Sequence, residues 1–236
     1  MGGGSQQMSQ QASVPTGAHT DRDDPAARDL PRVREDREGR EVIVVVCAAN
    51  ATRSPLAVAL LRRSLDRRGR SDITVLSSGL QCTPGQPATP EAMELATERG
   101  LDLSDHRSQS VEALDWSGVA LALTMTEEQR TQVQRRGLAD VSRTFTLPEF
   151  ARLIGTDGST SDKVGGVVRR AHQARPLVLP PYGAEEVPDP TGKSPRHLER
   201  TARQLEDAAE VIAEHLRPGA READPPPAPE PTTEPG

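Results

Sequence analysis

Aromatic residues are scarce in this 236-residue sequence, which contains one Trp, one Tyr and two Phe. No basic cluster is interleaved with these few rings, so the stacking that supports recognition of single-stranded nucleic acid has no basis here. The net charge of −6 argues in the same direction, because a phosphate backbone is bound by a surplus of Lys and Arg. We therefore expect no nucleic-acid partner.

Long apolar runs are also missing, and cysteines are few. No stretch approaches the roughly 18 apolar residues that a membrane-spanning helix requires, and the Gly- and Gln-rich start lacks the apolar segment of a secretory signal. The two cysteines, Cys47 and Cys82, are too few for a disulfide framework. A reactive thiol also requires a reducing compartment. These absences predict a cytoplasmic protein with no membrane partner.

Composition divides the chain into one domain and two tails. Residues 1–38 are rich in Gly, Gln and Ser and then in mixed charges, and residues 219–236 are Pro-rich and acidic. Neither segment has enough apolar residues to offset the entropy lost on ordering. We predict that both tails are disordered and interpret them as candidate segments for binding other proteins. The folded domain is then 39–218, in which 155–186 is interpreted as an insertion or loop.

The most informative stretch begins with a β-branched run at 42–46, which predicts a buried strand. Cys47 follows at once, Arg53 stands six residues later, and Pro55 opens an apolar helical stretch. Amide groups of a tight loop at a helix N-terminus bind tetrahedral oxyanions, because they have no intrahelical partners. Arg53 adds a planar fork of donors that matches two phosphate oxygens. The same positive field favours the Cys47 thiolate, which is a nucleophile.

Residues 47–55, Cys-Ala-Ala-Asn-Ala-Thr-Arg-Ser-Pro, resemble the signature of the low-molecular-weight protein tyrosine phosphatases, Cys-x-Gly/Ala-Asn-x-x-Arg-Ser-Pro. The alternative is a buried structural cysteine at a strand end, since free cysteine often serves as a small core residue. The resemblance implies that Cys47 attacks phosphorus and that Arg53 binds the phosphate oxygens. It also implies a substrate-binding loop that comprises Ala48, Ala49, Asn50, Ala51, Thr52 and Ser54, with Ser54 hydrogen-bonded to the thiolate.

Strand and helix patterns alternate along the rest of the domain. The helical stretch 55–68 lies between the strand patterns 42–46 and 73–78, which predicts a right-handed βαβ unit and parallel pairing. Further strands are expected at 118–124 and 141–147, and further helices at 90–99, 126–136, 148–154, part of 164–170, and 195 to about 216. The resemblance implies an α/β fold with a single four-stranded parallel sheet flanked by helices. Its active site would lie beyond the carboxyl ends of the strands.

A second chemical element is Asp189, which stands between Pro188 and Pro190. By itself such a sequence usually indicates a turn. The oxygen that leaves phosphorus needs a proton, however, and flanking prolines restrict the backbone of an aspartate that could supply it. In the phosphatase family an Asp-Pro on a similar loop supplies the general acid, so the resemblance assigns this role to Asp189.

Two further residues enter as supports of the loop. In the family a histidine hydrogen-bonds the loop asparagine and a strand-end serine belongs to the same network, which implies a set of Asn50, Ser77 and His106. Asn50 has an independent reason for its position, because asparagine tolerates the left-handed backbone that a tight anion-binding loop requires.

Three functions remain open from the sequence. The first is a phosphomonoester hydrolase that works through a cysteinyl-phosphate, with a phosphorylated substrate and with no metal and no cofactor. The second is an arsenate reductase that uses an external thiol, which would not need Asp189 in the same way. The third is a non-catalytic oxyanion-binding regulatory module, which would not need the complete set of Cys47, Arg53 and Asp189. Gln81 stands where the family often has tryptophan, so we also expect a cleft poor in aromatic residues.

Overall fold

The computed structural model describes Met1 and residues 40–156, 158–161, 163–175 and 185–217. Apart from Met1, the tails expected at 1–38 and 219–236 lie outside the described residues. Their disorder and the domain limits at 39 and 218 stay predictions.

Four parallel strands form one sheet in the order β2-β1-β3-β4. They are β1 (Val42–Cys47), β2 (Thr74–Gly79), β3 (Val119–Thr124) and β4 (Thr144–Thr146). This confirms the predicted α/β class and the four-stranded parallel sheet. The two inner strands, β1 and β3, are the ones between which ligands are bound in open sheets of this kind.

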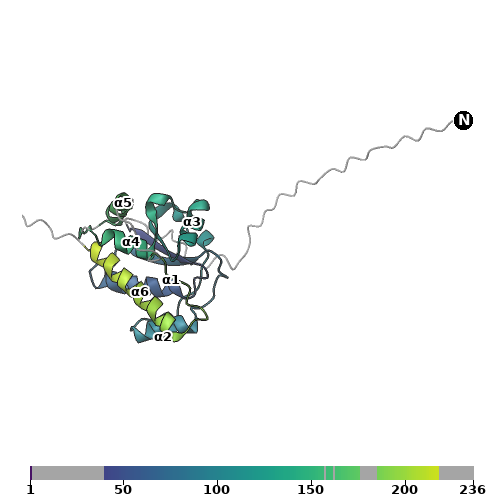
Figure 1. Ribbon diagram of the computed structural model, residues 1–236, viewed down its shortest axis with the longest axis horizontal. Coiled ribbons are helices and arrows are strands. Elements are labelled where there is room, and N and C mark those ends of the chain that lie inside the picture. Colours follow the sequence, from purple (N-terminus) through teal and green to yellow (C-terminus); the bar gives the residue numbers. More distant parts are fainter. Residues whose placement is uncertain (2–39, 157, 162, 176–184, 218–236) are drawn as a thin grey trace, which may run out of the picture. The chain divides into compact units, whose positions relative to one another are not determined.

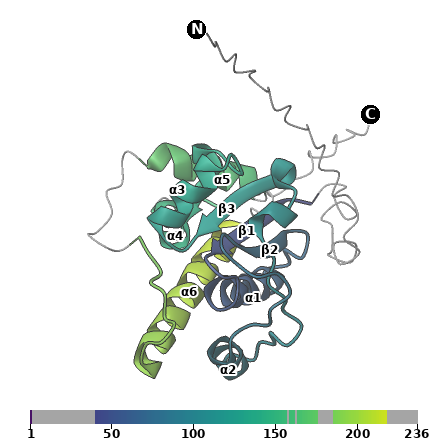
Figure 2. The same cartoon turned by 90° about the vertical axis from the view of Figure 1, so that its right-hand side faces the viewer.

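Helices cover the sheet on both sides. They are α1 (Arg53–Asp66), α2 (Pro90–Glu98), α3 (Glu127–Arg135), α4 (Leu147–Ile154), α5 (Val164–Ala174) and α6 (Pro195–His215). In the part of the chain that the structure describes, short 3-10 turns occur at Val111–Ala113, Trp116–Gly118 and Val141–Arg143. Figures 1 and 2 show α1 and α6 side by side, with α2 near them.

Strand β1 is buried on both faces, which explains its uninterrupted apolar sequence. Ile43 and Val45 belong to the larger core with α1 and α6, whereas Val42, Val44 and Val46 belong to a smaller core on the other face. Each of these five side chains is at most 2% exposed. The strand is therefore fixed from both sides where it delivers Cys47 to the carboxyl edge of the sheet.

Helix α1 begins at Arg53, two residues before the proline at which we expected it. Proline is tolerated in the first turn because the amide it lacks would have no intrahelical partner there. Arg53, at which the loop from Cys47 ends, and Ser54 consequently belong to the first helical turn. Both are buried, at 4% and 0% exposure, so their side chains have fixed surroundings.

Helix α6 packs along α1 and closes the larger core. Ala202, Leu205 and Ile212 are fully buried on its apolar stripe. At the margin of this contact, one arginine of α1 and one in the turn that follows it bind glutamates of α6, with Arg63 Nη2 at 2.7 Å from Glu206 and Arg68 Nε at 3.2 Å from Glu214. The basic end of α1 therefore has partners within the chain.

The expected insertion, 155–186, contributes helix α5, which packs on the domain. Val164, Val167, Val168 and Ala171 are buried in the larger core. The first amides of α5, at Val164 and Gly165, donate to the Glu41 carboxylate at 2.8 and 3.1 Å. Among the residues that the structure describes, no helix combines the length and the apolar composition needed to cross a bilayer.

Candidate active site

The loop from Cys47 to Arg53 wraps around the Cys47 sulfur. Asn50 has a φ of 53° and is, among the described residues, the one non-glycine residue in the left-handed region. This turn aims the Asn50 amide at Sγ (3.3 Å), while the Ser54 hydroxyl lies 3.0 Å from the same sulfur. Asn50 Nδ2 donates to Ser54 Oγ at 2.9 Å, so the hydroxyl hydrogen is left for the sulfur. Two donors therefore converge on Cys47, as negative charge on sulfur requires.

Backbone hydrogen bonds from neighbouring segments hold the loop. Its carbonyls accept from amides that follow β2 and precede α2, namely Leu80 N to Cys47 O (3.0 Å), Gln81 N to Ala48 O (2.9 Å) and Thr89 N to Ala51 O (2.9 Å). Thr52 contacts the hydroxyl of Thr89 at 3.2 Å. Ala49 is exposed, whereas Ala48, Ala51 and Thr52 are half-buried. The loop thus presents its open side to solvent and its carbonyls to the domain.

Asn50 is fixed by two further contacts. His106 Nε2 lies 2.7 Å from the Asn50 carbonyl oxygen, which can only accept, so this ring nitrogen carries the hydrogen. Burial lowers the pKa of His106 and Arg107 adds to this, although the bond to Asn50 opposes them. The Asn50 side-chain oxygen accepts from the Gln109 amide (2.9 Å), and Gln109 Nε2 donates to the Ser77 carbonyl (2.8 Å). Ser77 is thus joined to Asn50 through Gln109.

The sequence did not point to Gln109 or Thr89 as supports. Gln109 lies three residues after His106 and has no motif of its own, so its contact with Asn50 depends on the fold. Thr89 carries a recognisable signal, because a threonine followed by Pro90 is typical of a helix N-cap. Its second role, donating a backbone amide to Ala51, has no sequence signal.

Arg53 and Asp189 meet over the loop, although 136 positions separate them. Arg53 Nη2 lies 2.6 Å from Asp189 Oδ2, and Arg53 Nη1 donates to the Val187 carbonyl at 3.0 Å. The arginine side chain is 5% exposed and the aspartate side chain 53%. The structure therefore brings the two ends of the predicted site together.

The charge of Asp189 depends on opposing effects. Burial raises the pKa of Asp189. Two hydrogen bonds from Thr191 and the Arg53 charge together lower it by more, so the pKa lies below its usual value. The Thr191 amide and hydroxyl reach Asp189 Oδ1 at 3.0 and 2.7 Å. In this arrangement the aspartate is ionised at neutral pH and paired with Arg53.

Beside Asp189 lies a cleft of about 250 Å³ between the 186–190 segment and α6. Its lining contains no Phe, Tyr or Trp among the described residues and consists of Glu186, Pro188, Asp189, Pro190, Lys193, His197, Arg200, Thr201 and Gln204. This agrees with the expectation of an aromatic-poor surround on this side of the site.

Cys82, the second cysteine, lies next to the loop. Burial raises the pKa of the Cys82 thiol, and negative charge on Cys47 and Glu112 acts in the same direction, although hydrogen bonds from the backbone oppose both. A thiol with a raised pKa is a poor nucleophile near neutral pH. Cys82 is therefore ill suited to resolve an adduct on Cys47, as an arsenate reductase without an external thiol would require.

Gly79 is placed so close to the loop that a larger residue has no room. A Cβ atom there would lie 2.8 Å from the Ala48 carbonyl oxygen and 3.1 Å from Asn50 Cβ. We expect Gly79→Ala to displace the loop, to lower kcat/KM about tenfold and to reduce the free energy of unfolding by about 1–3 kcal/mol. Steady-state kinetics and urea unfolding measure these two effects.

Gly165→Ala in α5 is the matched control for Gly79→Ala. A Cβ atom at Gly165 would have a nearest neighbour at 3.9 Å, the tip of Arg169. This substitution should leave activity unchanged and raise stability by about 0.4–1 kcal/mol, because alanine restricts the unfolded chain more than glycine does. Full activity in Gly79→Ala would show that the close approach of Gly79 to Ala48 and Asn50 is not needed to position the loop.

A thiol at the end of a parallel strand is followed by a tight loop that ends in an arginine, and this arginine contacts an aspartate, an arrangement that fits a cysteine-dependent phosphatase. Residues 42–159, half of the chain, match the family model described as low molecular weight phosphotyrosine protein phosphatase. The chain belongs to this family, and it is a phosphatase.

Curated relatives and a solved structure agree with this assignment. A protein named probable low molecular weight protein-tyrosine-phosphatase EpsP, from Ralstonia nicotianae, is 38% identical over 110 residues, which cover 47% of this chain and 72% of the relative. A protein-arginine-phosphatase from Geobacillus stearothermophilus is 33% identical over 56% of this chain and 85% of its own length. The crystal structure of a YwlE mutant from Bacillus subtilis aligns with a TM-score of 0.56 and 26% identity, over 75% of this chain and 98% of that one.

Proposed function

We propose that Cys47 is the nucleophile, that Arg53 and the backbone amides of residues 48–53 bind the phosphoryl oxygens, and that Asp189 is the general acid and base. The observation that carries this proposal is the contact of Arg53 with Asp189 at 2.6 Å above the loop that surrounds the Cys47 sulfur. Nucleophile, anion-binding groups and proton donor are thereby within reach of one bound phosphoryl group.

In the first step the Cys47 thiolate forms a bond to phosphorus while the bond to the leaving oxygen breaks. Asp189 gives its proton to that oxygen, and Arg53 with the loop amides stabilises the charge on the three equatorial oxygens. In the second step water attacks phosphorus and gives a proton to the Asp189 carboxylate. The sulfur–phosphorus bond breaks, inorganic phosphate leaves, and Ser54 stabilises the departing thiolate through the hydroxyl that faces it.

Asp189 must be protonated before the first step, although its pKa is lowered when it is paired with Arg53. A phosphate dianion that takes the Arg53 guanidinium removes this cation from Asp189 and places negative charge beside it. Both changes raise the proton affinity of the carboxylate. Substrate binding thus converts the ion pair into a carboxylic acid beside the leaving group.

The substrate class that this site supports is a phosphorylated protein side chain in the cytoplasm. One relative is named for tyrosine phosphate and another for arginine phosphate, so both a phosphoester and a phosphoramidate are candidates. In both, the atom that leaves phosphorus accepts a proton, which gives Asp189 the same task. The tails expected at either end remain candidates for binding other proteins.

The test compares the full-length chain with Asp189→Asn on p-nitrophenyl phosphate, phenyl phosphate, a phosphotyrosine peptide and a phosphoarginine peptide. We expect hydrolysis by the wild type, and in Asp189→Asn a loss of about a hundredfold in kcat/KM on phenyl phosphate. The loss should be smaller on p-nitrophenyl phosphate, whose leaving group needs less help from an acid. Equal activity of the two proteins on phenyl phosphate would remove Asp189 from the mechanism.

A parallel incubation with arsenate and a small thiol addresses the second function considered from the sequence. Reduction of arsenate without ester hydrolysis would favour a reductase. Binding of phosphate without either reaction would favour a regulatory module. Neither outcome is expected, because the relatives named above are phosphatases.

A further inference from the structure

The segment that carries the general acid is tied to the domain at each of residues 185–187. We call residues 185–189 the acid strap. Glu186 is held twice, because its carboxylate accepts from the Glu127 amide (3.2 Å) and its carbonyl accepts from Gln204 Nε2 (2.8 Å). The Val187 amide donates to the Met125 carbonyl at 2.7 Å. The acid strap is thereby bound to α3, α6 and the residue that follows β3 before it reaches the site.

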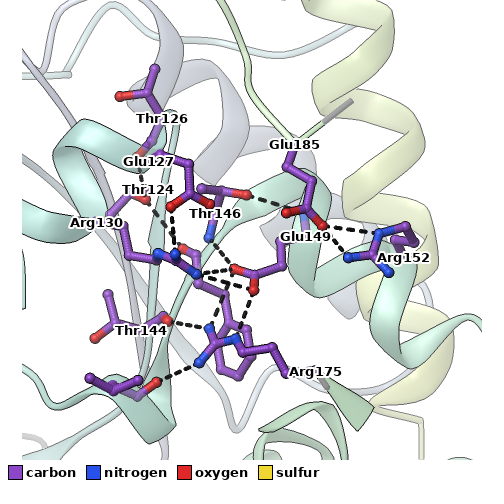
Figure 3. A network of polar contacts seen from close by, with 12 residues as sticks. Thr124, Thr126, Glu127, Arg130, Thr144, Thr146, Glu149, Arg152, Arg175 and Glu185 are labelled. Carbon is purple, nitrogen blue, oxygen red and sulfur yellow. Dashed lines mark hydrogen bonds and ion pairs between the residues drawn. The ribbon is translucent and has the colours of Figure 1, made fainter. Parts of the chain in front are cut away.

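The first anchor of the acid strap is an ion pair with α4. Glu185 Oε1 accepts from two guanidinium nitrogens of Arg152, with Nε at 3.0 Å. The side chains are 21% and 17% exposed, so this pair is less hydrated than one on the open surface. Figure 3 shows Arg152 and Glu185 pointing toward each other, beside the network around Glu149. This anchor lies four residues before Asp189. The hydrogen bonds and the ion pair described for Arg152 and Glu185 involve no residue of the loop from Cys47 to Arg53.

Helix α4 is itself firmly placed. It follows β4 directly, and its first turn is closed by a capping box between Thr146 and Glu149. The Glu149 carboxylate is also bound by arginines of α3 and of the end of α5. Because α4 is fixed to the sheet, the ion pair of Arg152 with Glu185 holds the start of the acid strap at a fixed place relative to the sheet.

We propose that Arg152 and Glu185 are positioning residues for proton donation by Asp189. This inference rests on the proposed function of Asp189. Flanking prolines restrict φ at 188 and 190, but they do not fix the direction from which the acid strap arrives. The Arg152–Glu185 pair sets that direction together with the anchors at Glu186 and Val187. Without the pair, the acid strap is held at fewer points, and the carboxyl group samples more positions from which the leaving oxygen is out of reach.

The variants are Arg152→Gln and Glu185→Gln, which remove the same pair from either side, and the charge swap Arg152→Glu with Glu185→Arg. Arg68→Gln is the matched control, because Arg68 is 23% exposed and pairs with Glu214 between α1 and α6, away from the acid strap. Urea unfolding of each variant verifies that it is folded under the conditions of the kinetic assay.

The kinetic readout is kcat/KM, which reports cleavage of the bond to the leaving group. We expect Arg152→Gln and Glu185→Gln to lose about tenfold on phenyl phosphate and less than about twofold on p-nitrophenyl phosphate. Arg68→Gln should keep both values, and the charge swap should recover part of the loss on phenyl phosphate. A loss that is equal for the two esters would indicate a general structural effect and would overturn the inference.

Hydrogen exchange of the peptide that covers 185–191 provides a readout that does not depend on activity. Loss of the pair should speed exchange in this peptide, which contains the Val187 amide, and Arg68→Gln should not. Unchanged exchange in both single variants overturns the inference while the proposed function stands. If the wild type hydrolyses none of the esters, the proposed function and the kinetic part of this inference are both overturned. The hydrogen-exchange rate of the 185–191 peptide then shows whether the Arg152–Glu185 pair holds the acid strap.

Discussion

Cys47→Ser is expected to abolish ester hydrolysis, with a loss in kcat on the order of 10⁴-fold or more. The serine hydroxyl is protonated at neutral pH and is a far weaker nucleophile toward phosphorus than a thiolate. Among the described residues, the groups that hydrogen-bond at this position are the Asn50 amide and the Ser54 hydroxyl, which are arranged to donate and so do not deprotonate the serine. Release of inorganic phosphate from p-nitrophenyl phosphate at saturating substrate measures the loss.

Phosphate binding should survive in Cys47→Ser, since Arg53 and the loop amides are unchanged. Titration with inorganic phosphate, followed by calorimetry, should give a dissociation constant within about threefold of that of the wild type, because one oxygen replaces one sulfur at the floor of the loop. Cys82→Ser is the matched control and should retain nearly full activity. Hydrolysis by Cys47→Ser at more than a few per cent of the wild-type rate would show that another residue attacks phosphorus.

The sequence predicted the centre of the molecule well because the relevant information there is local. A run of β-branched residues that is buried on both faces is informative by itself, and so is an arginine six residues after a cysteine at its end. Asn50 was expected to adopt a left-handed backbone, and its φ of 53° confirms this. These features follow from the properties of neighbouring residues.

The outer strand was predicted less accurately. We expected a strand over 141–147, and the structure has Thr144–Thr146. Asp140 accounts for the difference, because its carboxylate accepts from the Ser142 amide at 2.9 Å and starts a 3-10 turn. Val141, the first residue of the expected strand, is 54% exposed. A side-chain cap outweighed the apolar alternation here.

Contacts between distant segments could not be predicted from the sequence. Gln109 joins Asn50 to Ser77, and Arg152 joins α4 to Glu185, yet neither belongs to a motif. Arg and Gln are common surface residues, and their partners are set by how the fold places separate loops. The pairing of Arg53 with Asp189 could have been predicted from the sequence, because the two residues had been assigned to one site on separate grounds.

Glu149→Gln is expected to lower the free energy of unfolding by about 3 kcal/mol, because it leaves two arginines without their shared carboxylate. Figure 3 shows Glu149 between Arg130 and Arg175. Its side chain is 3% exposed, while those of the arginines are 23% and 19% exposed. Arg130 lies 3.0 Å from Oε2 and Arg175 Nε 2.7 Å from Oε1. The arginines retain some access to water, which places the expected loss at the lower end for a buried pair.

The choice of glutamine separates charge from shape. Glutamine has nearly the same volume and can replace glutamate in the capping box of α4, so the loss measures the missing charge. Glu214→Gln is the matched control, because Glu214 also binds two arginines but is 41% exposed, and it should cost less than about 1 kcal/mol. Urea unfolding followed by the fluorescence of Trp116, the single tryptophan, compares the two variants. Equal losses in the free energy of unfolding for Glu149→Gln and Glu214→Gln would mean that the buried carboxylate stabilises the fold no more than the exposed one.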